Sequence, residues 1–253
     1  MINIENKSTW PEDILLFMHE HYRGFIGWEC EGEYPSSGPS YDQLVGSLSE
    51  ILKKYSMRGF HCTKLTVDEI LNIETHGLAL QNKRTLSNRI NILLNSGQIS
   101  QDIANSLLNE NQSDDRNRAN MLWFCFYAPR LAGRHGIERF FMHWGGEALY
   151  NSHETNAVTS PILQEIGIPC IVEALVPFQS MPDIQLPFGQ FTRSFLKDQG
   201  YKLENELTFE AYITAHLPPT QIIEIHQYPS KSFLELSDCA NWDVPIATFS
   251  NRH

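Results

Sequence analysis

The stretch RGFHCTKLTVDEILNIETHGL, residues 58–78, joins a short strand-like segment to a helix whose two ends are both marked by sequence signals. Thr66 and Glu69 have the spacing of a capping box, in which each side chain satisfies a backbone N–H at the start of the helix. Gly77 is the residue type that adopts a left-handed conformation and ends a helix. The sequence therefore predicts a strand followed at once by a helix over residues 66–76.

The rest of the chain divides into helical and strand-like patterns. Helical periodicity occupies an N-terminal region, residues 1–57, and an insertion, residues 83–120. Strand-like runs lie at residues 121–127, 168–178, 208–214 and 221–228. The first of these, MLWFCFY, is apolar throughout, so we expect a central strand covered on both faces. This order predicts an α+β fold with a main domain over residues 58–253.

Composition limits the function classes. The chain has 19 basic and 30 acidic residues among 253, a formal charge of −11, which opposes non-specific attraction to nucleic acid. The best candidate for a local basic surface is the cluster Lys83, Arg84 and Arg89. The alternative is that these charges only form the solvated side of a helix. The sequence has neither a signal-peptide pattern nor an apolar run long enough to span a membrane, which predicts a cytoplasmic protein without membrane contact.

Metal and nucleotide motifs are missing from the sequence. It contains no GxGxxG, GxxxxGK[ST], GxSxG or HExxH motif, and its five cysteines are scattered without a CxxC pair. The histidine pairs considered as metal ligands are His19 with His21 and His143 with His153. Histidines two positions apart do not share a helix face, so we expect no metal site.

Two candidate polar sites lie on predicted strands. His61 and Thr63 share one face at the end of the first strand, whereas Cys62 points to the opposite face and cannot form a Cys/His dyad with His61. His and Thr at such an edge suit the capture of a ribose or amide group, the alternative being a histidine satisfied near a helix cap. In FEAYI, Glu210 and Tyr212 alternate with apolar residues and should face away from the core.

The order of these segments resembles the ADP-ribosyltransferase superfamily, and more specifically its diphtheria-toxin and poly(ADP-ribose) polymerase branch. The resemblance runs over residues 58–228, from FHCT through CIVEALVPF to FEAYITAHLPPTQIIEI, and leaves residues 1–55 and 83–120 outside it. It implies a split antiparallel sheet as the core, with an N-terminal helical region and a helical insertion. It also implies a His, Tyr, Glu set that handles NAD.

The resemblance assigns roles to individual residues. His61 would hold a ribose hydroxyl of NAD, with Cys62 in the place of a family glycine and Thr63 at the third position of that motif. The catalytic glutamate would be Glu210, with Glu206 as a rival. The tyrosine that stacks on nicotinamide would be Tyr150, preferred because Gly145-Gly146 precedes it, or Tyr127. Further residues expected near NAD or the acceptor are Trp144, Glu147, His153 and Glu154.

The resemblance also implies a reaction. Cleavage of the bond from ribose to nicotinamide would pass through an oxocarbenium-like transition state that Glu210 stabilises. NAD would be a consumed substrate, and no metal would be needed. The ADP-ribose acceptor would be a protein, a nucleic acid or water, as in bacterial toxins and anti-phage effectors, and a toxin would imply an antitoxin partner. The alternatives are a non-catalytic module that binds a nucleotide or a partner on the same fold, and a structural scaffold.

Overall fold

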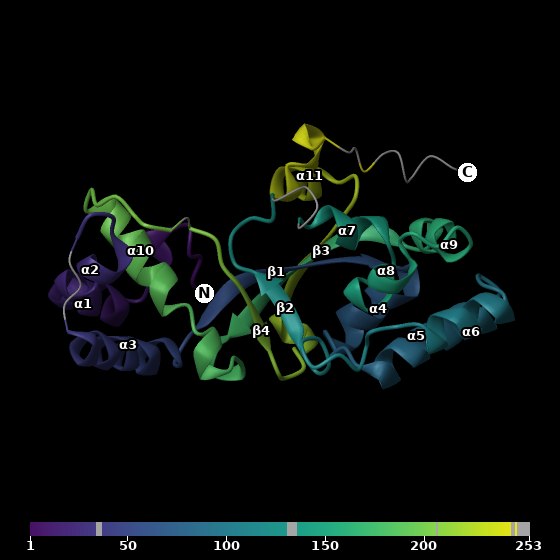
Figure 1. Cartoon of the computed structure of the whole chain (residues 1–253), viewed down its shortest axis with the longest axis horizontal. Helices are drawn as coiled ribbons and strands as arrows, with labels where there is room; N and C mark the ends of the chain where they lie inside the picture. The colour runs from purple at the N-terminus through teal and green to yellow at the C-terminus, as the bar shows by residue number, and fades with distance from the viewer. Residues whose placement is uncertain (34–36, 131–135, 206, 244–245, 247–253) are drawn as a thin grey trace. The chain divides into compact units, whose positions relative to one another are not determined.

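The computed structural model describes residues 1–33, 37–130, 136–205, 207–243 and 246 (Figure 1). The protein belongs to the α+β class and is about half helical, with an N-terminal helical region and a five-stranded antiparallel sheet. The helices are α1 (Glu12–His21), α2 (Ile26–Glu29), α3 (Gly38–Leu52), α4 (Val67–His76), α5 (Lys83–Asn95), α6 (Gln101–Asn109), α7 (Glu138–Met142), α8 (Glu147–His153), α9 (Thr159–Glu165), α10 (Phe188–Asp198) and α11 (Lys231–Ser237). The strands are β1 (Ser56–Leu65), β2 (Leu122–Cys125), β3 (Ile168–Pro177), β4 (Glu210–Ile213) and β5 (Ile222–Gln227).

The sheet does not follow the order of the chain. Its strand order is β4-β2-β1-β3-β5, so β1 is the middle strand and β2 has β1 and β4 as its neighbours. Strand β5 pairs antiparallel with β3, and Glu173 lies opposite Glu224 in this register. A bulge between Glu173 and Ala174 interrupts the pairing. The strands that carry His61 and Glu210 therefore flank the same strand, β2.

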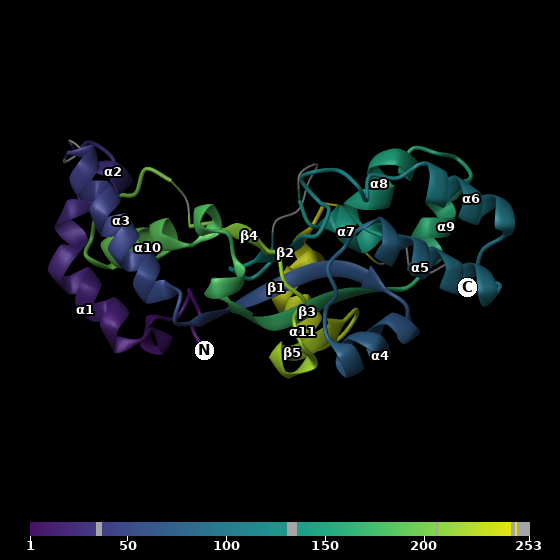
Figure 2. The same cartoon turned by 90° about the horizontal axis from the view of Figure 1, so that it is seen from below.

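The chain forms two compact units, which are described separately. The first unit comprises Met1–Gly59, Cys125–Tyr127 and Leu175–Ile213, and the second comprises Phe60–Phe124, Ala128–Ala174 and Thr214–His253. In the first unit, α1 and α2 gather with α3 and α10 into one helical group, which can be followed in both views (Figures 1 and 2). The sequence-based boundary between residues 57 and 58 stays a prediction.

The helical insertion of the second unit is part of a larger core. Helix α5 packs against α6, and α8 packs against α9. Side chains from all four helices and from the segment before α8 share one buried apolar cluster: Leu86, Ile90, Leu93, Ile99, Ile103, Ala104, Leu107, Trp144, Leu149, Leu163 and Ile166. The insertion at residues 83–120 is thus held by apolar burial and does not form a body of its own.

Both predicted ends of α4 are confirmed. The backbone N–H of Glu69 donates to Thr66 Oγ1 at 3.2 Å, and the N–H of Thr66 donates to Glu69 Oε2 at 2.8 Å, which completes the capping box. Gly77 follows the helix with a φ of +85°. A Cβ at Gly77 would lie 1.9 Å from the carbonyl oxygen of Leu217, so glycine is required there both for its φ and for the close approach of the backbone.

Candidate functional site

The hydrogen bond of His61 determines its tautomer. Nδ1 of His61, on β1, lies 2.9 Å from the carbonyl oxygen of Trp123, on β2. A carbonyl oxygen only accepts hydrogen bonds, so Nδ1 carries the hydrogen in this contact. In the neutral ring, Nε2 then has a lone pair and acts as an acceptor. His61 can therefore accept a hydrogen bond from a ligand hydroxyl group, as the sequence-based role for this residue requires.

The surroundings of His61 favour the neutral ring. Burial lowers the pKa of His61 below its usual value, the hydrogen bond to Trp123 opposes this, and the positive charge of Arg89 lowers the pKa further. The net shift is downwards, so the imidazole is uncharged at neutral pH. A neutral imidazole keeps Nε2 available as an acceptor.

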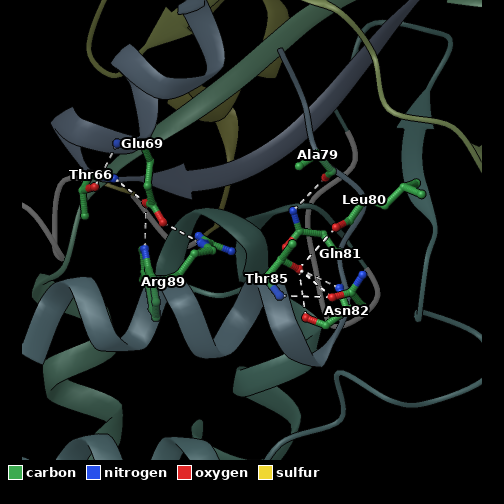
Figure 3. Close-up of polar contacts among 9 residues, drawn as sticks. Thr66, Glu69, Ala79, Leu80, Gln81, Asn82, Thr85 and Arg89 are labelled. Carbon is green, nitrogen blue, oxygen red and sulfur yellow. Dashed lines mark hydrogen bonds and ion pairs between the residues drawn. The ribbon is translucent and has the colours of Figure 1, made fainter. Parts of the chain in front are cut away.

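Arg89 has a different role from the one that the basic cluster suggested. Its Nε donates to Glu69 Oε1 at 2.5 Å (Figure 3). Its guanidinium lies 4.6 Å from the ring centroid of Trp144. Nε1 of Trp144 donates to the other carboxylate oxygen of Glu69 at 2.9 Å. The interpretation of Arg89 as part of a solvated face is wrong, because its side chain is only 19% exposed.

These contacts control the charge of Glu69. Burial alone would raise the pKa of Glu69, but the guanidinium of Arg89 and the donors from Thr66 and Trp144 outweigh it, and the net shift lowers the pKa. Glu69 is therefore a carboxylate that accepts three hydrogen bonds, from Thr66, Arg89 and Trp144. It connects the start of α4, helix α5 and Trp144 within the second unit.

Strand β2 is not buried on both faces as we expected. Leu122, Phe124 and Phe126 are buried, whereas Trp123 is 40% exposed and Cys125 is partly exposed. Burial therefore alternates along this run, as in a strand with one accessible face. The sequence MLWFCFY does not indicate the accessible face, because the residues on that face are themselves apolar. Sequence reasoning missed Trp123, an accessible aromatic residue whose backbone carbonyl is bonded to His61.

Glu210 lies as the alternating pattern predicted. It is the exposed first residue of β4, while Ala211 and Ile213 are fully buried. The thiol of Cys125 lies 3.7 Å from Glu210 Oε1 and donates to it, so the carboxylate has a weak partner on β2 and retains acceptor capacity. The rival residue, Glu206, lies outside the described residues.

The other two residues of the FHCT motif are buried. Cys62 is 8% exposed and Thr63 is 9% exposed. Both lie in β1, so their backbone groups belong to the middle strand of the sheet. The side chain of Cys62 therefore belongs to the core.

The aromatic residues named for nicotinamide have different surroundings. Tyr127 is half-buried, with its hydroxyl 3.4 Å from Gln190 Oε1, and burial raises its pKa to about 12. It lines a cavity of about 460 Å³ in the first unit. The charged residues around this cavity are Glu5, Lys7, Lys197 and Asp198.

Tyr150 and Trp144 are enclosed in the second unit. Tyr150 is 2% exposed, and the guanidinium of Arg139 lies 4.1 Å from its ring centroid. Trp144 is fully buried. A nicotinamide could stack on Tyr150 only after Arg139 moved away, so the role of Tyr150 stays a prediction that needs such a movement.

The remaining residues expected near the acceptor hold the second unit together. Glu147 pairs with Arg118 at 3.0 Å, and Glu154 pairs with Arg139 at 2.7 Å. His153 is fully buried, with Thr159 Oγ1 at 2.9 Å and the carbonyl oxygen of Glu110 at 2.7 Å from its two ring nitrogens.

Comparison of the chain with protein-family models, with curated proteins and with solved structures finds no match. Among the described residues, no group of three or more His, Cys, Asp or Glu side chains is arranged so that it could hold a metal ion. Within the same part of the chain, no helix has the length and apolar character needed to cross a membrane.

Proposed function

We propose that the protein is an NAD-consuming ADP-ribosyltransferase, with His61 and Trp123 as residues that bind NAD and Glu210 as its catalytic glutamate. The observation that carries the proposal is the tautomer of His61: its Nδ1–H is bound to a backbone carbonyl, and Nε2 is left as an acceptor. Such an acceptor suits a ribose hydroxyl group. The backbone carbonyl is that of Trp123, whose side chain is 40% exposed and would supply an aromatic face for nicotinamide.

Glu210 supplies the charge that the reaction needs. When the C–N bond from ribose to nicotinamide breaks, positive charge develops on the ribose, and a carboxylate held nearby stabilises it. The electron pair of the bond leaves with nicotinamide. The acceptor then forms a bond to the ribose carbon and loses its proton, with Glu210 as the base.

The acceptor is proposed to be a macromolecule, protein or nucleic acid, as in toxins and anti-phage effectors. The charge of −11 disfavours free nucleic acid as a partner without a local basic surface. Two of the three residues of the basic cluster have acidic partners, since Lys83 pairs with Asp114 and Arg89 pairs with Glu69. A protein acceptor is therefore the favoured class, and a protein antitoxin is the partner that a toxin would require.

Two observations favour a second candidate, a non-catalytic module that binds a nucleotide. Tyr150 is enclosed, and Cys62 stands where the resembling family has a glycine. A site with an altered motif can retain nucleotide binding after turnover is lost. This candidate predicts binding of NAD without release of nicotinamide.

The test uses NAD labelled on its adenylate half, incubated with the purified protein and with the protein, RNA and DNA fractions of a cell lysate. Glu210→Gln should abolish label transfer, while Glu204→Gln, a change at an exposed glutamate of the same unit, should leave it unchanged. Trp123→Ala should weaken NAD binding about tenfold in calorimetry, since stacking on an aromatic side chain is worth about 1 to 3 kcal/mol.

The outcomes separate the two candidates. Transfer into one fraction that depends on Glu210 supports the transferase and identifies the acceptor class. NAD binding without transfer and without free nicotinamide supports the binding module. Absence of NAD binding removes both candidates.

A further inference from the structure

A chain of three polar side chains lies in the second unit, on β3, β5 and α11. Nε2 of His226 lies 2.8 Å from Glu173 Oε2, and Nδ1 of His226 lies 2.8 Å from Ser232 Oγ. His226 is 4% exposed and Glu173 is 6% exposed, whereas Ser232 is partly exposed. A hydroxyl that solvent can reach is thus joined through an imidazole to a buried carboxylate.

The partners of His226 determine the direction of its hydrogen bonds. An ionised carboxylate only accepts, so Nε2 carries the hydrogen and donates it to Glu173. In the neutral ring, Nδ1 then has the lone pair, and the hydroxyl of Ser232 donates to it. This is the arrangement of nucleophile, base and orienting carboxylate that activates a serine.

Ser232 is not needed to cap its own helix. The N-cap residue of α11 is Ser230, and its Oγ accepts the backbone N–H of Phe233 at 3.2 Å. Ser232 lies in the first helical turn, so it is positioned by the helix backbone. Its hydroxyl lies 2.8 Å from the imidazole and also 3.3 Å from Ser230 Oγ, a contact in which Ser230 can be the donor, so the hydrogen of Ser232 can go to the imidazole.

A second carboxylate, that of Glu224, lies beside the imidazole of His226. Glu224 lies opposite Glu173 in the pairing of β3 with β5, and its Oε1 is 3.4 Å from His226 Nδ1. Two carboxylates facing each other across a sheet repel. A positive charge on the ring between them reduces that repulsion. The bulge after Glu173 is a feature often found beside active sites.

We propose that Ser232, His226 and Glu173 form a second catalytic site, an acyl-transfer site for small carboxylic esters. Ser232 Oγ forms a bond to the acyl carbon while its proton moves to His226 Nδ1. The ester C–O bond then breaks, and the alcohol leaves with that proton. Water attacks the acyl-serine, gives its proton to His226 and releases the carboxylic acid, and the proton returns to Ser232 Oγ. The net reaction converts ester and water into acid and alcohol.

The experiment treats the full chain with a fluorophosphonate, which phosphonylates an activated serine with loss of fluoride. Intact-mass spectrometry measures the rate, and peptide mapping locates the adduct. We expect one adduct on Ser232 and none in Ser232→Ala. The control, Ser106→Ala, changes another partly exposed helical serine of the same unit and should label at the native rate.

Glu173→Gln tests the role of the carboxylate, because it keeps the shape of the side chain and removes its charge. Labelling of this variant should be at least tenfold slower, and the release of p-nitrophenol from p-nitrophenyl acetate should fall in parallel. An absent adduct on the native chain, an adduct at another residue, or an equal rate in Glu173→Gln would overturn the proposal. The position of the adduct on the native chain decides the question even if Glu173→Gln fails to fold.

Discussion

Replacing Glu69 by alanine is the most direct test of the contacts that connect α4 with α5. The carboxylate of Glu69 accepts from Arg89 Nε at 2.5 Å, from the backbone N–H of Thr66 at 2.8 Å and from Trp144 Nε1 at 2.9 Å. Alanine removes all three bonds at once. It also leaves the guanidinium of Arg89 without its carboxylate in a largely buried position.

The contacts allow an estimate of the cost. Removing one partner of a buried ion pair typically destabilises by about 3 to 5 kcal/mol, because the remaining charge stays buried without compensation. The side chains of Glu69 and Arg89 are 17% and 19% exposed, so the lower end of that range, about 3 kcal/mol, applies. The lost bond to the N–H of Thr66 adds about 1 kcal/mol. We expect a total loss of about 4 kcal/mol, with partial overlap among the terms.

Urea unfolding and amide hydrogen exchange measure this loss globally and locally. Glu74→Ala, on the exposed face of the same helix, is the matched control and should change the free energy of unfolding by no more than about 0.5 kcal/mol. The pKa of Glu69 is lower in the folded protein than in the unfolded chain. The stability that its carboxylate contributes is therefore fully present above the pKa of the unfolded chain, and it is lost as the pH falls through the pKa of the folded protein. The difference in free energy of unfolding between the native protein and Glu69→Ala should therefore become smaller at acidic pH. A loss below about 1 kcal/mol at neutral pH, with unchanged exchange in α4 and α5, would refute the reasoning.

Three further predictions concern single residues. Burial lowers the pKa of Lys64 to about 8 from 10.5. Between pH 8 and pH 10.5 the unfolded chain therefore binds more protons at this group than the folded protein does. The free energy of unfolding should consequently rise by about 3 kcal/mol as the pH increases over that range. Lys64→Met should lack that rise when urea unfolding is compared at pH values near 7 and 10.5, and an equal rise in both proteins would contradict the prediction. Gly77→Ala should lower the free energy of unfolding several times more than Gly97→Ala, as measured by thermal unfolding. Both glycines have a positive φ, and Gly97→Ala should cost about 1 kcal/mol for that reason, but only Gly77 has a carbonyl oxygen 1.9 Å from the added Cβ. Similar losses of stability in the two variants would rule out the steric explanation. Ser100→Ala removes the N-cap of α6, whose side chain accepts a hydrogen bond from the backbone N–H of Ile103. The free energy of unfolding in urea should fall by about 1 kcal/mol, and amide hydrogen exchange should become faster only in the first turn of α6. An unchanged free energy of unfolding would mean that the cap contributes nothing.

The features that the sequence predicted well are those that depend on neighbouring residues. The capping box of Thr66 with Glu69 and the glycine after α4 are both local signals, and each lies where it was expected. The alternation around Glu210 is equally local and is confirmed by burial. Such patterns fix the conformation of a segment without knowledge of what packs against it.

The features that were missed depend on residues far apart in the sequence. Trp123 is accessible because one face of β2 is open, and an entirely apolar run cannot indicate which of its faces is covered. Arg89 resembled a solvated charge until Glu69 and Trp144 were found beside it. Only the arrangement of strands and helices brings such partners together, and no spacing within a segment encodes it.

The order of the sheet affects how the chain acquires its structure during synthesis. Strand β1 is complete at Leu65, but its two neighbours begin at Leu122 and Ile168, and the strand that completes the other side of β2 begins at Glu210. A ribosome releases the chain from the N-terminus, so the middle strand of the sheet emerges long before either neighbour, while α4, α5 and α6 can form from local contacts. Contacts between distant segments form slowly, and unpaired strands are prone to aggregate in the interval. Formation of the sheet is thus expected to be the late step of folding, at which the nascent chain depends most on chaperones.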